Sequence, residues 1–257
     1  MIQLHTIEEI EILRENNLLV SKTLAELAGW IKPGMSTDKL DKLAYEFICD
    51  NGAKPGFLGY QGYPNTLCTS VNEQVVHGIP SAYQLKEGDI ISIDCGVLKN
   101  NYYGDTAYTF AVGNISEEKH KLLEITMKSL YLGIEQAKEG ARVGDIGYAV
   151  QSFCEANGFS VVRELVGHGL GKNLHEAPEV PNYGRRGKGA KLAEGMVICI
   201  EPMINLGRKE IVQESDGWTI RTSDRKPSAH FELAVAIRKG EADILSSFGF
   251  IEAILNN

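Results

Sequence analysis

The chain has 257 residues, 43% of them hydrophobic and 23% charged, a composition ordinary for a globular enzyme with a sizeable core. Its net charge of −8 disfavours broad nucleic-acid binding. No apolar run approaches the roughly 20 residues that span a bilayer, and the polar N-terminus is not a signal peptide. The five cysteines include no Cys-x-x-Cys pair, so we expect no disulfide-linked partner and a reducing cytoplasm.

Two amphipathic helices are predicted at the start of the chain. Residues 6–30 keep apolar side chains at near-helical spacing, and Thr6 with Glu9 forms a capping box. Residues 37–50 have the same periodicity and stop at Asn51-Gly52, a typical C-terminal signal.

The second of these helices recurs 106 residues further along the chain. A helix predicted over 117–137 precedes the copy, as the helix over 6–30 precedes the original. Coincident Gly, Phe and Asn-Gly positions are not explained by chance helical periodicity. The matched positions are Gly34 and Gly140, Leu40 and Ile146, Leu43 and Ala149, Phe47 and Phe153, and Asn51-Gly52 and Asn157-Gly158.

A strand-like segment is duplicated as well. The segment ending at Asp94 recurs, at an offset of 107, in a segment ending at Glu201. We interpret the chain as one α/β (α+β) domain with duplicated halves of about 1–112 and 113–257. Each half is a helix-plus-hairpin unit, and ligands are expected at the junction.

Residues 90–98 and 103–112 are predicted to form a hairpin with Asn100-Asn101 at its turn, because Asn tolerates positive φ. In that register Asp94 and Asp105 project from one face as diagonal neighbours, roughly 7–8 Å apart at the backbone. Two half-buried acids on a solvated face are the alternative. However, an unpaired carboxylate beside an apolar run is costly, and a bound cation would offset that cost.

Three more side chains extend this acidic set. Glu201 is the counterpart of Asp94, and Glu232 lies in the strand-like run 230–235. His168 lies between them in a Gly-rich segment and would add a nitrogen ligand. Four carboxylates and one imidazole suit a pair of divalent cations, which would promote peptide or ester hydrolysis.

Other polar positions carry weaker signals. His77 and His175 are candidates, although an ordinary structural or surface histidine explains either alone. Glycines on both sides of His168 are expected to let the backbone approach a ligand. That segment lacks the Gly-Lys-Ser/Thr ending of a phosphate loop. No Ser-His-Asp or Cys-His order stands out, so a side-chain nucleophile is disfavoured.

Spaced motifs run through nearly the whole chain: His77-Gly78-Ile79-Pro80, Asp94, Gly104-Asp105-Thr106, Gly167-His168-Gly169-Leu170-Gly171, His175-Glu176-Ala177-Pro178, Ile200-Glu201-Pro202 and Glu232. In order and spacing they resemble the type I methionine aminopeptidases of the short bacterial type. The resemblance implies the pita-bread fold, with duplicated units around a central antiparallel sheet. It also implies removal of the initiator methionine from nascent polypeptides when the second residue is small.

The same resemblance implies two divalent cations per chain, and the ligand types admit cobalt, manganese, iron or zinc. Asp105 and Glu232 would bridge the cations. Asp94 would bind mainly one of them, and His168 and Glu201 mainly the other. Glu201 would also accept a proton as a metal-bound hydroxide attacks the scissile carbonyl.

Substrate contacts follow from the resemblance too. His77 and His175 would contact the peptide and stabilise the tetrahedral intermediate. An aromatic core cluster remains the alternative explanation for Phe57 and Leu174, two members of the implied methionine pocket. That pocket comprises Phe57, Tyr60, Tyr63, Cys68, Leu174 and Trp218.

Two departures and two rival functions accompany this assignment. Leu233-Ala234 follows the last glutamate where the family often has His-Thr, and Leu174 stands where an aromatic residue is common. A proline-specific peptidase of the same fold is one rival, although such enzymes usually carry an additional N-terminal domain. An inactive binding protein acting through the basic segment Arg185–Lys191 is the other. For a monomeric enzyme, that segment is compatible with a transient ribosome contact or with a solvated loop.

Overall fold

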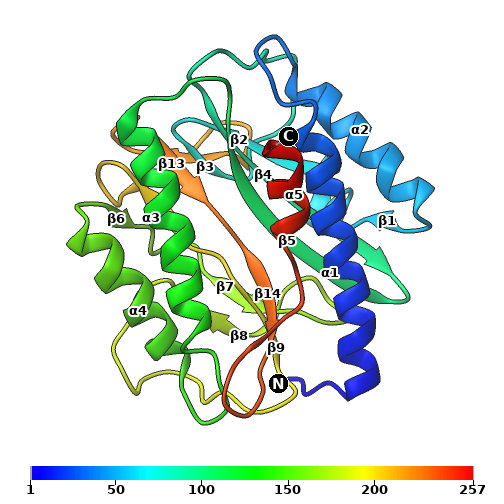
Figure 1. Ribbon diagram of the computed structural model, residues 1–257, viewed down its shortest axis with the longest axis vertical. Helices are drawn as coiled ribbons and strands as arrows, with labels where there is room; N and C mark the ends of the chain where they lie inside the picture. Colours follow the sequence, from blue (N-terminus) through cyan, green and yellow to red (C-terminus); the bar gives the residue numbers. More distant parts are fainter. Residues whose placement is uncertain (1, 257) are drawn as a thin grey trace.

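The computed structural model describes residues 2–256, which contain five α-helices and the 3-10 helix η1 (Tyr60–Gly62). In Figure 1, α3 and α4 lie on one side of the molecule and α1, α2 and α5 on the other, with β5 and β14 between them. No helix among residues 2–256 combines the length and the apolar character needed to cross a bilayer. The α-helices are α1 (Ile7–Ala28), α2 (Thr37–Asp50), α3 (Glu117–Ile134), α4 (Val143–Ala156) and α5 (Gly249–Leu255).

The strands form antiparallel sheets, as expected, but the sheet is divided into four parts. One part joins β1, β2 and β5 to β4, and another has the order β15-β14-β9-β7-β8. The smaller parts have the orders β13-β10-β6 and β11-β12-β3. The strands are β1 (Lys54–Pro55), β2 (Leu67–Val71), β3 (Gln74–Val76), β4 (Ile90–Lys99), β5 (Tyr102–Ala111), β6 (Ser160–Val161), β7 (Gly167–Gly169), β8 (Glu176–Val180), β9 (Val197–Ile200), β10 (Met203–Asn205), β11 (Ile211–Gln213), β12 (Ile220–Thr222), β13 (Ser228–His230), β14 (Leu233–Ala236) and β15 (Asp243–Ile244).

Several positions matched by the predicted duplication have similar backbone contacts. Gly34 and Gly140 have φ values of +87° and +89°, a region that favours glycine. Their N–H groups donate to the carbonyls of Leu85 and Leu192 at 2.8 and 3.0 Å, respectively. These matches support two copies of one unit. Other matched features are the bridges Ser36–Gln84 and Arg142–Lys191 and the helix caps Asn51 and Asn157.

Helix α1 is fastened to the β4–β5 hairpin by two buried asparagines. The predicted capping box precedes the helix, which ends two residues before the predicted limit. Asn16 donates its amide to the carbonyls of Lys99 and Tyr102 at 2.9 and 2.7 Å, which ties the hairpin turn to the helix. Asn17 accepts a 3.0 Å hydrogen bond from the backbone N–H of Asp105. The helix therefore fixes the strand that carries one of the predicted metal ligands.

The hairpin has the predicted turn and register. Asn100 and Asn101 have φ values of 54° and 63°, as a tight two-residue turn requires. Asp94 lies opposite Ala107, so Asp94 and Asp105 share one face of the sheet.

The two halves meet along a seam of backbone contacts between β5 and the chain around β13 and β14. Glu232 donates its N–H to the carbonyl of Ala107 at 2.9 Å. The Thr109 hydroxyl donates to the His230 carbonyl at 2.7 Å and accepts from the His230 N–H at 2.9 Å. The run predicted as one strand over 230–235 is therefore interrupted, because Phe231 and Glu232 leave β13 and cross the seam before β14 begins.

Candidate metal centre and adjoining pocket

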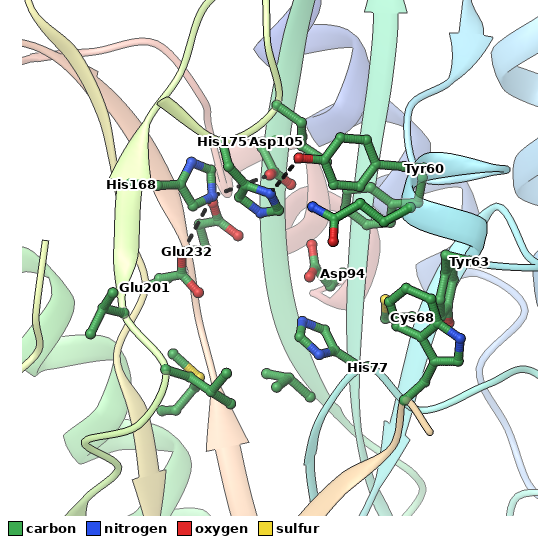
Figure 2. A pocket seen from close by; sticks show the side chains of 18 of the residues that line it. Tyr60, Tyr63, Cys68, His77, Asp94, Asp105, His168, His175, Glu201 and Glu232 are labelled. Atoms are coloured by element: carbon green, nitrogen blue, oxygen red, sulfur yellow. Dashed lines mark hydrogen bonds and ion pairs between the residues drawn. The ribbon is translucent and has the colours of Figure 1, made fainter. Parts of the chain in front are cut away.

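All five predicted ligands line a single cavity of about 320 Å³. Asp94 and Asp105 come from the β4–β5 hairpin of the first half, and His168 comes from β7 of the second. Glu201 directly follows β9, and Glu232 directly precedes β14. Figure 2 shows the carboxylates of both halves pointing toward one another across the seam.

His168 presents one ring nitrogen to the carboxylates. Its Nε2 lies 3.7 Å from Oδ2 of Asp105 and 3.5 Å from Oε1 of Glu201. Its Nδ1 lies 2.9 Å from the Gly169 carbonyl, which can only accept, so Nδ1 carries the hydrogen. Burial lowers the pKa of His168 to about 3. The imidazole is therefore neutral near pH 7, with a lone pair on Nε2 facing the acids.

The negative charge of the four carboxyl groups is not balanced by basic side chains among the described residues of the cavity. Burial raises the pKa of Asp94 to about 6, and burial followed by repulsion from Glu232 raises the pKa of Asp105. Burial is also the main cause of the raised pKa of Glu201 and Glu232. Among the described residues that line the cavity, none is Lys or Arg.

Several of these oxygens also lack partners. Buried oxygens of Asp94, Asp105 and Glu232 accept no hydrogen bond from the described residues. An unpaired buried acceptor is costly, and clustered acids repel one another. Divalent cations would satisfy both the oxygens and the charge, so this donor set fits a metal.

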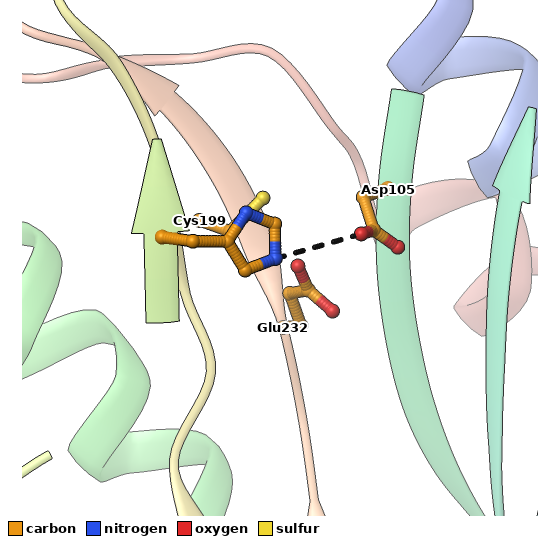
Figure 3. A group of neighbouring side chains, drawn as sticks. Asp105, Cys199 and Glu232 are labelled. Carbon is orange, nitrogen blue, oxygen red and sulfur yellow. Dashed lines mark ion pairs between the residues drawn. The ribbon is translucent and has the colours of Figure 1, made fainter. Parts of the chain in front are cut away.

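Two members of the cluster were missed from the sequence. The donor atoms of Cys199 lie within 4.8 Å of those of Asp105, His168 and Glu232 (Figure 3). His230 is buried, and its Nε2 lies 3.7 Å from Oε2 of Glu201. Each precedes a predicted glutamate by two residues, so the two-residue period of a strand could have placed both on the site face.

The predicted substrate histidines line the same cavity. Nδ1 of His175 lies 2.9 Å from the hydroxyl of Tyr60, and the ring packs edge-on against His168 with centroids 4.4 Å apart. His77 adopts a φ of 60°, and burial lowers its pKa to about 4. Burial also lowers the pKa of His175. Both imidazole rings are therefore neutral near pH 7, and each can donate one hydrogen bond and accept another.

An aromatic wall adjoins the acids. Cys68 on β2 lies directly opposite Asp94 on β4, which places the wall beside the carboxylates. The ring of Tyr63 packs edge-on against Trp218 with centroids 5.1 Å apart, and its hydroxyl donates to the Leu67 carbonyl at 2.9 Å. The six predicted pocket residues all line the cavity: Phe57, Tyr60, Tyr63, Cys68, Leu174 and Trp218.

The expected purpose of the glycines around His168 was wrong. A Cβ at Gly167 would lie 2.3 Å from the Cys199 carbonyl, and one at Gly169 would lie 2.4 Å from the Ala177 carbonyl. The neighbouring strands β9 and β8 occupy this space. The two glycines therefore let β7 carry His168 close to both strands.

The chain is similar to known peptidases over nearly its whole length. A model of metallopeptidase family M24 matches residues 11–239. The methionine aminopeptidase of Clostridium perfringens and methionine aminopeptidase 1 of Bacillus subtilis are each 50% identical over 246 residues, which cover 96% of this chain and 99% of each relative. The crystal structure of methionine aminopeptidase from Rickettsia prowazekii is 40% identical, with a TM-score of 0.95 over 96% of this chain and 100% of that one.

A proline-specific enzyme is less similar. The prolidase from Pyrococcus furiosus is 25% identical, with a TM-score of 0.75. The superposition covers 95% of this chain but 65% of the prolidase. The prolidase therefore contains a large part that has no counterpart here.

Proposed function

Because this chain belongs to metallopeptidase family M24, we propose that it releases the N-terminal methionine of nascent polypeptides whose second residue is small. The observation that carries the proposal is one cavity that joins a cluster of buried acids to an aromatic, sulfur-lined wall. The acids suit hydrolysis at the end of a peptide, and the wall suits the side chain of its first residue.

Two divalent cations are assigned to the acids. Asp105 and Glu232 would contribute to holding both cations, Asp94 mainly one, and His168 and Glu201 mainly the other. The unpartnered oxygens of Asp94, Asp105 and Glu232 support this assignment, as does the free lone pair on His168. Bound divalent cations supply Lewis acidity at the carbonyl and lower the pKa of a water nucleophile.

The aromatic wall, which includes Cys68, would hold the methionine side chain. A thioether makes favourable contacts with ring edges, worth about 0.3–1.5 kcal/mol each. The edge-on packing of Tyr63 and Trp218 leaves ring edges at the cavity. Leu174 is buried. Its aliphatic side chain has more rotatable bonds than a rigid aromatic ring, so this part of the wall can adapt its shape more easily.

Three polar side chains are assigned to the reaction. Glu201 would accept the proton of the attacking water, since its carboxylate lines the cavity 3.5 Å from Nε2 of His168. Tyr60 donates its hydroxyl hydrogen to Nδ1 of His175, which leaves Nε2–H free to donate to the developing oxyanion. His77, a neutral and half-buried side chain that lines the same cavity, positions the peptide backbone.

The partners of the enzyme are nascent chains, and we place the enzyme in the cytoplasm as a monomer. All five cysteines are free thiols. Contact with the ribosome would use Arg185–Lys191, a segment whose basic side chains are exposed. Its backbone is anchored to α4, because Gly187 donates to Oδ1 of Asp145 at 2.7 Å. A fixed, exposed positive loop suits RNA phosphates.

The test compares Met-Ala-Ser, Met-Lys-Ser and Ala-Pro-Ser peptides, using chelator-stripped protein restored with manganese, iron, cobalt or zinc. The proposal expects metal-dependent cleavage of Met-Ala-Ser alone. Cleavage of Ala-Pro-Ser instead would assign the chain to the proline-specific branch. Metal binding without any cleavage would favour a binding protein.

A further inference from the structure

We propose that the sulfur of Cys199 is a metal ligand, which makes one of the two cation positions selective for thiophilic ions such as zinc, cobalt and cadmium. The inference deepens the proposed function and rests on it for the presence of a cation between the two halves. It adds a donor that none of the predicted ligand roles includes.

The backbone places Cys199 among the ligands. It lies on β9 two residues before Glu201, so both side chains project from the same face. Its partner in β14 is Ala234, next to the crossing that carries Glu232. The close approach of Gly167 to the Cys199 carbonyl brings the neighbouring His168 to the same place.

The side chains complete a compact donor set. The sulfur of Cys199, one ring nitrogen of His168 and one oxygen each of Asp105 and Glu232 all lie within 4.8 Å of one another. Figure 3 shows Cys199 in one group with Asp105 and Glu232. One cation can reach donors at such separations, because metal–ligand bonds are about 2.0–2.3 Å long.

An independent observation points to a cation here. Asp105 and Glu232 are only 3% and 2% exposed, and each has a buried oxygen without a hydrogen-bond partner. Cys199 is fully buried, so its thiol is not a surface sulfur that happens to lie near acids. A cation at the centre of the set would satisfy both oxygens and the sulfur.

The chemistry of the set determines which cations it favours. On binding, the thiol releases its proton to solvent and the sulfur lone pair forms the bond to the cation, so no oxidation or reduction occurs. Together with Glu201, which is assigned to the same cation as His168, the position offers oxygen, nitrogen and sulfur donors, and the sulfur favours thiophilic ions. The position nearer Asp94 offers oxygen ligands and suits manganese better. The two positions would therefore differ in the metals they prefer.

Cadmium alone is the probe, because a cadmium–thiolate bond produces an ultraviolet charge-transfer band. The exposed Cys49 is first replaced by Ser, so that a surface thiol does not bind cadmium. Chelator-stripped protein is then titrated with Cd²⁺. We expect a saturable band with one equivalent, its loss in Cys199→Ser, and its retention in Cys68→Ser. The Cys68 variant is a matched control, since Cys68 is buried in the same cavity but outside the donor set.

The charge-transfer band separates a metal ligand from a neighbouring hydrogen-bond donor, because affinity alone changes in both cases. Loss of an outer partner typically weakens metal binding about 10- to 100-fold without removing a band. Cys199→Ser is expected to remove the band, to weaken Cd²⁺ binding at least about 10-fold and to change Mn²⁺ binding much less. A band that persists in Cys199→Ser, or Cd²⁺ binding without any band in the parent, would overturn the proposal.

Two further measurements keep the outcomes distinguishable. If Cys199→Ser does not fold, the Co²⁺ spectrum of the parent decides, since a cobalt–thiolate band is expected and its absence would refute sulfur ligation. Peptide cleavage with Mn²⁺ is measured separately. A parent that shows the band but cleaves no methionine peptide would refute the proposed function and leave Cys199 as a ligand.

Discussion

Replacing Asp94 by Asn is expected to stabilise the metal-free protein at neutral pH while destroying its metal-dependent activity. The carboxyl has a pKa of about 6 in the fold, mainly because of burial, against 3.8 without the fold. The folded state therefore binds the proton more tightly than the unfolded state. The cost of ionising Asp94 in the metal-free fold is therefore absent below about pH 4 and reaches its full size as the pH rises through 6.

The size of this effect follows from the two pKa values. A difference of about two pH units corresponds to on the order of 3 kcal/mol at pH 7.5. Asn cannot ionise, so the variant escapes that cost. Removal of the charge also relieves repulsion on Asp105 and Glu201, whose pKa values Asp94 raises. The gain in unfolding free energy should vanish toward pH 4.

Urea unfolding from pH 4 to 8 in excess chelator tests this expectation. Asp50→Asn is the control, because Asp50 is exposed and its substitution should leave the pH slope unchanged. Mn²⁺ at 1,000 times its dissociation constant should reverse the order, since it would stabilise the wild type by about 4.1 kcal/mol. The reasoning fails if the chelated variant is no more stable than the wild type at pH 7.5.

Three other substitutions probe separate parts of the site. His175→Ala should lower kcat about 100- to 1,000-fold, as loss of an oxyanion donor does, with unchanged metal affinity by calorimetry; equal loss of metal would place His175 among the ligands. Trp218→Ala should reduce the preference for methionine over leucine about 2- to 10-fold in kcat/KM, the size of a sulfur–aromatic contact; an unchanged ratio would remove Trp218 from the pocket. Asn17→Ala leaves the buried N–H of Asp105 unpaired, so it should lower the unfolding free energy by about 1–3 kcal/mol. Urea midpoints measure that loss, and a neutral effect would mean that water replaces the amide.

Local chemistry made much of the hairpin predictable. Asn100 and Asn101 accept positive φ, which determined the turn and the pairing of Asp94 with Ala107. The duplicated segment then identified Glu201 as the counterpart of Asp94. Because these signals depend on residues close in sequence, they required no knowledge of how the halves pack.

Other features depend on contacts between distant segments. The crossing at Phe231 and Glu232 could not be predicted from the apolar sequence of residues 230–235. Hydrophobic periodicity alone does not show where a strand ends and the chain pairs with a new partner. Cys199 and His230 were missed because cysteine and histidine are often buried for packing alone. The partners of the glycines around His168 also come from elsewhere in the chain.

The seam gives the centre a kinetic property as well as a geometry. Glu232 donates its backbone N–H to Ala107 across the seam while its carboxylate lines the cavity. Any local opening that breaks this backbone contact would also withdraw an acid from the cluster. Hydrogen exchange at the Glu232 amide should therefore slow when metal binds, since exchange reports the free energy of such opening. Escape of a cation and opening of the chain would then be one event with one rate.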